Sequence, residues 1–210
     1  ICHRIFADVA VEAYLHSGIT PEQLAAQSVG VYVGHSGGSP DFGDITIGTL
    51  AAQAYEPLRG IPDAPSVLGD RVDAIIAAAA ERLRHGKPQR SADGGPRSES
   101  RWAAELVART LGLTGPNMVL DAACSSSLVA LALGELALER GEIDVAIVGG
   151  ASYAQTNSLI LFSQAQSCSA KGSRPFDAGA DGLVGSEGYV AMVLKTEAQA
   201  RADGDTILAV

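Results

Sequence analysis

The stretch MVLDAACSSSLVALALGELALER, residues 118–140, decides the fold class. It starts as a strand-like run, MVLDAA, turns at a cysteine among small residues, and continues as an apolar helix over residues 125–140. Strand, sharp turn and helix in direct succession are typical of a nucleophile elbow. Cys124 would lie where unpaired N–H groups at the start of the helix favour a thiolate. The segment predicts either a catalytic cysteine or a buried, inert one.

The rest of the chain repeats this alternation of strand and helix. Further strands are expected at 29–34 (VGVYVG), 145–151 (VAIVGGA), 188–195 (GYVAMVLK) and 206–210 (TILAV). Further helices are expected at 5–16, from Thr20-Pro21-Glu22 onward, and at 71–84, 102–112 and 196–205. Such alternation predicts an α/β sheet with right-handed crossovers.

Two helices carry further expectations about burial. Ile5, Val9, Ala13 and His16 share one side of the first helix, which should face the core. The helix at 125–140 is apolar nearly all round, which predicts burial on most sides. The polar stretch at 85–100, HGKPQRSADGGPRSES, is expected to be a loop excursion within one domain rather than a linker between two.

Composition excludes several classes of protein. The 210 residues suffice for one large domain, and a formal net charge of −9 argues against a nucleic-acid surface. No apolar run reaches membrane-spanning length, so we expect a cytoplasmic protein. The three cysteines are far apart and the four histidines form no evident ligand cluster. Cys2-His3 is the only adjacent Cys-His pair, and it does not predict a metal site by itself.

Two other segments compete with Cys124. Ser36 lies in GHSGG, residues 34–38, which matches the G-x-S-x-G pattern of a serine hydrolase. That pattern needs a helix directly afterwards, whereas turn-forming residues follow here, so a glycine-rich loop is favoured and His35 is expected to be a satisfied loop residue. Arg174, Asp177 and Asp181 could form a catalytic cluster, but aspartates that hold turns are the commoner arrangement.

Several segments together resemble the β-ketoacyl synthases, the ketosynthase domains of polyketide and fatty acid synthases. These segments, in family order, are VGVYVGHSGGS, GLTGPN, DAACSSS, IDVAIVGGA and RPFDAGADGLVGSEG. The details HSGGS, DAACSSSLVAL, SYAQTNSLILFSQAQS and DGLVGSEGYVA look most like iterative ketosynthases of enediyne type I polyketide synthases, and an ordinary modular ketosynthase is the nearest competitor. Ser186 replaces the glycine of most ketosynthases, a departure that fits the enediyne subgroup.

The resemblance implies a fold and a chemistry. The family has the thiolase-like fold of αβαβα layers, and residues 1–210 look like its N-terminal half plus the start of the second half. Cys124 matches the nucleophile that accepts an acyl group and then reacts with malonyl-carrier protein in a decarboxylative Claisen condensation, an acyltransferase activity. Its backbone N–H would serve in the oxyanion hole. The resemblance implies no directly bound cofactor, because the substrates are carried on acyl-carrier-protein phosphopantetheine.

The resemblance also sets limits. The family takes its catalytic histidines from H-G-T-G-T and N-x-G-H motifs, which this sequence lacks, so the chain alone is expected not to condense. A homodimer is expected for the complete domain, with the strand at Asn117–Ala122 near the two-fold axis. Two alternatives remain: a non-catalytic partner of the chain-length-factor type, which the intact Cys124 disfavours, and a hydrolase that uses Cys124 or Ser36.

Overall fold

The structure is a computed structural model that describes residues 2–36, 60, 69, 71–85, 99–153 and 156–210. The chain divides into two compact units, Ile1–Gly38 with Ser100–Val210, and Ser39–Glu99. In the second unit, helix α5 (Arg71–Arg84) confirms the helix expected there. Most of the expected loop at 85–100 lies outside the described residues. No helix in the described part of the chain is both long and apolar enough to cross a membrane.

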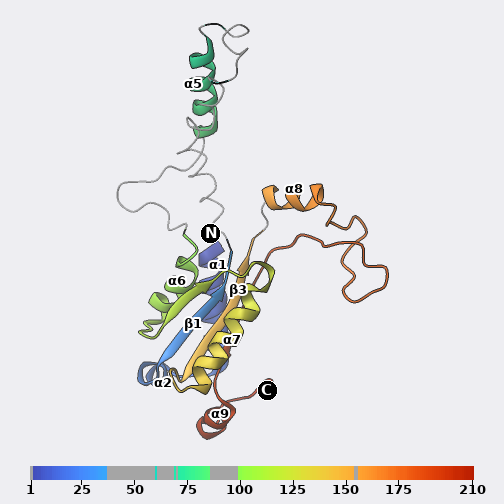
Figure 1. Ribbon diagram of the computed structural model, residues 1–210. Helices are drawn as coiled ribbons and strands as arrows, with labels where there is room; N and C mark the ends of the chain where they lie inside the picture. Colours follow the sequence, from blue (N-terminus) through green and yellow to red (C-terminus); the bar gives the residue numbers. More distant parts are fainter. Residues whose placement is uncertain (1, 37–59, 61–68, 70, 86–98, 154–155) are drawn as a thin grey trace. The chain divides into compact units, whose positions relative to one another are not determined.

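The first unit is built on a four-stranded mixed sheet, drawn as arrows in Figure 1. Its strands are β1 (Val29–Gly34), β2 (Asn117–Leu120), β3 (Val145–Ser152) and β4 (Gly188–Leu194). Their order in the sheet is β2-β1-β3-β4. Strand β1 runs parallel to β2 and β3, whereas β4 is antiparallel to β3. The expected α/β sheet is therefore confirmed, with β2 and β4 at its edges.

Helices α1 (Cys2–Ser17) and α6 (Trp102–Leu111) pack together on one face of the sheet. Phe6, Val107 and Ile147 are fully buried between them and the strands. The expected inward face of α1 was wrong by one position. The buried side follows Phe6, Ala10 and Tyr14, while Ile5 is 37% exposed. The aromatic rings of Phe6 and Tyr14 bury more apolar area than the residues of the expected face, and they set the rotation of the helix.

Helix α7 (Ser126–Glu139) covers the other face of the sheet. Ala130 and Ala137 face the strands and pack against Tyr32 and Val148. The expectation that this helix is buried on most sides is wrong for the described residues. Its outer side exposes large apolar side chains: Leu128 (68%), Val129 (37%) and Leu136 (37%). The sheet can cover only one side of a helix, so an all-round apolar sequence leaves the other side uncovered here.

The remaining elements are short. They are α2 (Pro21–Ala26), α8 (Thr156–Gln164) and α9 (Glu197–Asp203). Helix α2 begins as expected, because Thr20 and Gln23 form a capping box. The expected strand at 206–210 is wrong: these residues have no regular structure, and Leu208 is 78% exposed. A β-branched run forms a strand only where another strand pairs with it, and β4 does not pair with these residues.

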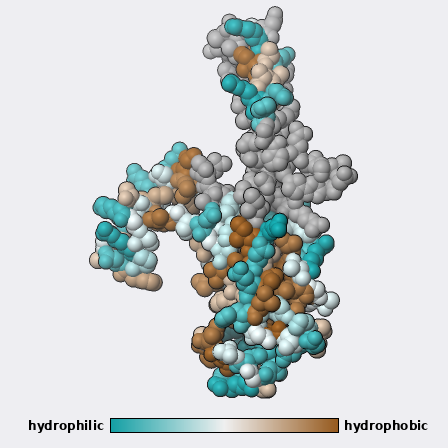
Figure 2. All heavy atoms as spheres, turned by 180° about the vertical axis from the view of Figure 1, so that it is seen from behind, coloured by the Kyte–Doolittle hydropathy of each residue, from teal (hydrophilic) through white to brown (hydrophobic). Residues whose placement is uncertain are grey.

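Exposed hydrophobic side chains occur on several elements of the first unit. Figure 2 shows brown, hydrophobic residues at the surface between teal, hydrophilic ones, on the side opposite to Figure 1. Independently of this view, the large hydrophobic residues that are exposed in the first unit include Leu15, Leu128, Val190, Met192 and Leu208. Single exposed hydrophobic residues are ordinary in proteins, but three large ones on one helix, Leu128, Val129 and Leu136 on α7, indicate a surface that another layer can cover.

Candidate active site at the first turn of helix α7

Cys124 lies in a tight turn between β2 and α7. The strand ends at Leu120, three residues earlier than the sequence suggested, and Ala123–Ser125 form a short 3₁₀ turn, η2. Ala123 has φ of 52°, a left-handed conformation that is uncommon for any residue except glycine. This turn places Cys124 two residues before the start of α7, with an exposed side chain. The nucleophile-elbow geometry expected from the sequence is therefore present.

Side chains on both sides of Cys124 hold this turn. The Ser126 hydroxyl accepts a hydrogen bond from the Ala122 N–H at 2.9 Å and donates to the Ala123 carbonyl at 2.6 Å. The Asp121 carboxylate accepts from the Ala123 N–H at 3.0 Å. Ser125 donates to the Ala122 carbonyl at 2.8 Å. These bonds satisfy the backbone groups that a left-handed residue would otherwise leave open.

Gly34 allows the end of β1 to pass directly under the first turn of α7. A Cβ atom at this position would overlap the backbone of Ser126 and Ser127. Only glycine permits such close contact between two backbones. The close approach fixes the start of α7, and therefore Cys124, relative to the end of a buried strand.

An open cavity of about 490 Å³ lies beside Cys124. The ends of β1 and β3, the start of β4 and the first turns of α7 line it. Its apolar walls come from Leu128, Leu131, Val148, Val190 and Met192. A cavity with a thiol at its edge and aliphatic walls can accept an apolar acyl chain and present its carbonyl carbon to the sulfur.

His35 also lines this cavity, but both nitrogens of its ring contact residues other than Cys124. Its side chain is 2% exposed, and Nδ1 donates to the Ala151 carbonyl over 2.8 Å. Its Nε2 lies 3.3 Å from Nε2 of His3. Neither contact involves Cys124, so the structure agrees with the expectation of a satisfied loop histidine rather than a base for the thiol.

Ser36 lines the same cavity and is exposed. The residues that follow it, 37–59, lie outside the described residues. The helix that the serine hydrolase pattern requires after Ser36 therefore stays untested, and Ser36 is disfavoured only by the turn-forming residues that follow it in the sequence.

Asp177 holds a turn, as expected, and Asp181 joins two stretches of the segment before β4. Asp177 accepts a hydrogen bond from the Gly179 N–H at 2.6 Å. Asp181 accepts from the Ser169 hydroxyl at 2.5 Å and pairs with Lys171 at 3.4 Å. Both aspartates stabilise the segment that leads into β4, and neither they nor Arg174 line the cavity beside Cys124.

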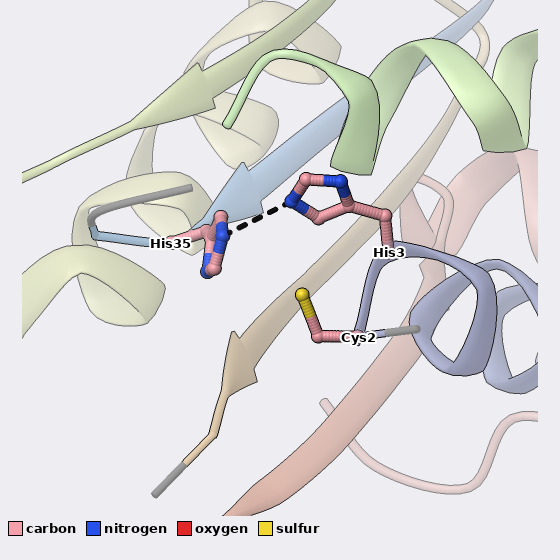
Figure 3. A group of neighbouring side chains, drawn as sticks. All are labelled: Cys2, His3 and His35. Carbon is pink, nitrogen blue, oxygen red and sulfur yellow. Dashed lines mark hydrogen bonds between the residues drawn. The ribbon is translucent and has the colours of Figure 1, made fainter. Parts of the chain in front are cut away.

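Sequence reasoning missed one cluster of potential metal ligands, because the expectation was that the histidines form no ligand cluster. Cys2 and His3 at the start of α1 come together with His35 at the end of β1, as Figure 3 shows. The adjacent Cys-His pair was visible in the sequence, but its third member lies 32 positions away, and only the packing of α1 against the sheet brings it close.

The comparisons with known proteins agree with this fold. The family described as "Beta-ketoacyl synthase, N-terminal domain" matches residues 1–200. Polyketide synthase GfsA of Streptomyces halstedii is 32% identical over 209 residues, which is 99% of this chain and 2% of that protein. The mycocerosic acid synthase-like polyketide synthase of Mycobacterium tuberculosis is 31% identical over 99% of this chain and 8% of its own length.

Solved structures give the same result. The ketosynthase from module 6 of the bacillaene synthase of Bacillus subtilis superposes with a TM-score of 0.67 at 29% identity, over 98% of this chain and 28% of that one. The oxazolomycin ketosynthase domain of Streptomyces albus gives 0.69 at 26% identity, over 100% of this chain and 30% of that one. This chain thus spans less than a third of each of these proteins, with the α/β architecture of the N-terminal half of the ketosynthase fold. It belongs to the β-ketoacyl synthase family and carries the N-terminal domain of a polyketide synthase ketosynthase.

Proposed function

We propose that this chain supplies the acyl-accepting cysteine of a polyketide ketosynthase. The Cys124 thiolate attacks the carbonyl carbon of an acyl thioester held on carrier-protein phosphopantetheine. A new carbon–sulfur bond forms, and the phosphopantetheine thiolate leaves and takes up a proton. The observation that carries this proposal is the exposed Cys124 at a sharp strand–helix turn, beside a cavity with aliphatic walls.

We assign the backbone N–H of Cys124 as one oxyanion-hole donor. Its two neighbours are already used, since the Ala123 N–H donates to Asp121 and the Ser125 N–H donates to the Ala122 carbonyl. A donor at the nucleophile itself lies close to the position where the thioester oxygen gains charge. This placement supports the assignment but leaves the second donor to residues of the larger enzyme.

The complete reaction is proposed for the larger enzyme. After acylation, malonyl-carrier protein loses carbon dioxide, and the resulting enolate carbon attacks the acyl-Cys124 carbonyl, which frees the thiol. Decarboxylation needs positioned donors for the enolate, and removing such groups typically costs orders of magnitude in rate. His35 contacts Ala151 and His3, so it does not provide such a donor to the cavity. We expect this chain alone to be acylated but not to form a ketide.

Partners and subgroup follow from the same proposal. The partners are an acyl-carrier-protein domain and a second copy of the ketosynthase, in the cytoplasm, with no resident cofactor. The edge position of β2 supports pairing with a second copy. The enediyne subgroup stays a proposal that rests on HSGGS and on Ser186, which lines the cavity beside Cys124.

The test is intact-protein mass spectrometry after incubation with an acyl thioester, and separately with a cerulenin-like epoxide. We expect one acyl group, mapped by peptide digestion to Cys124. Cys124→Ala should lose the label, whereas Cys168→Ser and Ser36→Ala should keep it. A label on Ser36 would favour a hydrolase instead. Labelling that persists in Cys124→Ala, or ketide formation by this chain alone, would contradict the proposal.

A further inference from the structure

We propose that Cys2, His3 and His35 bind a zinc ion. The three side chains are nearly inaccessible to solvent, with exposed fractions of 2%, 5% and 2%. Cys2 and His3 belong to the first turn of α1, and His35 follows directly after β1. One ligand atom of each residue lies within 4.8 Å of the other two. Figure 3 shows the sulfur and the two rings pointing toward one shared space.

The separation of the two rings suits a shared metal. The Nε2 atoms of His3 and His35 lie 3.3 Å apart. This is longer than most hydrogen bonds from nitrogen, so the contact between the rings is weak. Two nitrogens that each lie about 2.0–2.1 Å from a tetrahedral zinc ion are about 3.3–3.4 Å apart. The existing distance between the two nitrogens therefore matches the length of one edge of a zinc tetrahedron.

The hydrogen bond from His35 to Ala151 favours metal binding at the other ring nitrogen. Its Nδ1 lies 2.8 Å from the Ala151 carbonyl oxygen, which can only accept a hydrogen bond. Nδ1 therefore carries the hydrogen, and in the neutral ring Nε2 carries a lone pair that faces His3. An imidazole that donates one N–H to a backbone carbonyl and offers the other nitrogen is the usual arrangement of a zinc-bound histidine.

Binding requires a defined transfer of one proton. The Cys2 thiol loses its proton to solvent as sulfur binds the ion, and His3 holds its hydrogen on Nδ1 so that Nε2 can bind. One thiolate and two imidazoles suit zinc, whereas magnesium and calcium prefer oxygen ligands. Water completes the tetrahedron, and the thiolate offsets one of the two charges of the ion.

The location gives such a site a structural consequence. A bound ion would tie the start of α1 to the end of β1. His35 also lines the cavity beside Cys124, so the ion would fix one wall of the candidate active site. Because zinc would bind the folded chain and not the unfolded one in this arrangement, it should raise the melting temperature.

The test uses Co²⁺ as a spectroscopic probe on the reduced chain, followed by displacement with Zn²⁺. We expect visible bands of tetrahedral Co²⁺ with a thiolate charge-transfer band, at one ion per chain. Cys2→Ser should remove the charge-transfer band. His3→Gln and His35→Gln should weaken binding by more than the ~10–100-fold that loss of a supporting hydrogen bond costs.

Matched controls separate this site from the other thiols and histidines. Cys168→Ser, Cys124→Ser and His16→Gln should leave the spectrum unchanged, and circular dichroism should show that each metal-free variant is folded. Zn²⁺ should raise the melting temperature of the unmodified chain and of these controls, but not of Cys2→Ser. A wild-type chain with no thiolate band and no melting shift would overturn the proposal. A band that survives Cys2→Ser but not Cys124→Ser would also overturn it.

Discussion

At the scale of single residues, the exposure of Cys124 depends on the buried hydroxyl of Ser126. Ala123 has a left-handed backbone, and the Ser126 hydroxyl bonds to backbone groups of both Ala122 and Ala123. Ser126 is 5% exposed, so water cannot readily replace these bonds. The hydroxyl thus stabilises a strained turn whose purpose is to point one sulfur outward.

We predict that Ser126→Ala destabilises the chain by about 1–3 kcal/mol, because it removes two hydrogen bonds that contribute about 0.5–1.5 kcal/mol each. Alkylation of Cys124 by iodoacetamide should also change in rate as the turn relaxes. Ser125→Ala is the matched control, since Ser125 is exposed and its hydroxyl makes a single hydrogen bond, to the Ala122 carbonyl, so its loss should cost less than the loss of Ser126. Urea unfolding measures both variants, and equal free energies of unfolding would disprove the role of Ser126.

Residue patterns predicted the strand, turn and helix around Cys124 but not the contacts that hold the turn. Cys124 could be found because strand-forming residues, a cysteine among small residues and a helix follow one another directly in the sequence. The left-handed backbone of Ala123 could not be predicted, since alanine has no preference for that conformation. The contact of His35 with His3 was also unpredictable, because it depends on how far α1 reaches along the sheet.

At the scale of elements, strands and helices were predicted well where their neighbours did not matter. The buried strand β1 and the capped helix α2 follow from local sequence. The rotation of α1, the exposure of α7 and the missing strand at 206–210 depend on what packs or pairs with each segment. The periodicity of apolar residues predicts whether a segment is a helix or a strand. Which of its side chains are buried depends on the elements that pack against it.

The connection from β4 to α9 shows how a buried charge fixes two elements. The Lys195 side chain is 5% exposed and donates to Asp203 at 2.6 Å and to Asp205 at 2.5 Å. Burial alone lowers the pKa of Lys195, but the bonds to both carboxylates outweigh it, so the pKa is raised. The bond from Lys195 lowers the pKa of Asp203.

We predict that Asp203→Asn lowers the melting temperature at pH 7. The Asp203 contribution is complete above the pKa of an unfolded aspartate, about 3.9, and is lost as pH falls through the lower pKa of the folded state. The Lys195 contribution is lost only as pH rises through its raised pKa. Melting curves from pH 2 to 7 should therefore fall less steeply toward acid in Asp203→Asn than in the original chain.

Glu197→Gln is the control for this prediction, because Glu197 forms an exposed pair with Arg201 within the same helix. Such surface pairs contribute little to stability. If both variants showed the same melting temperature at pH 7 and the same slope toward acid, the Lys195–Asp203 pair would contribute no more to stability than the exposed pair.

At the scale of the whole molecule, the sheet edge formed by β2 is available for pairing with a second copy. Strand β2 is an edge strand, exposed or half-exposed along its length, and Met118 on it is 38% exposed. An edge strand carries unpaired backbone N–H and C=O groups, which a second copy can satisfy. This agrees with the proposed dimer, in which β2 lies near the two-fold axis.

We predict that Met118→Lys weakens this dimer in the ketosynthase domain that contains the chain, since it places a charge at the contact between two edge strands. Sedimentation velocity should show a shift from dimer to monomer. Leu15→Lys is the control, because Leu15 is an exposed apolar residue on α1. An original domain that already sediments as a monomer would refute the pairing.

The outer side of α7 has a practical consequence for anyone who produces this chain. Leu128, Val129 and Leu136 expose hydrophobic side chains to water, and the hydration of this area costs free energy in proportion to its size. Chaperones, detergent micelles and neighbouring copies all reduce that cost by covering these side chains. Yield in an expression host should therefore follow the supply of chaperones more closely than the rate of synthesis.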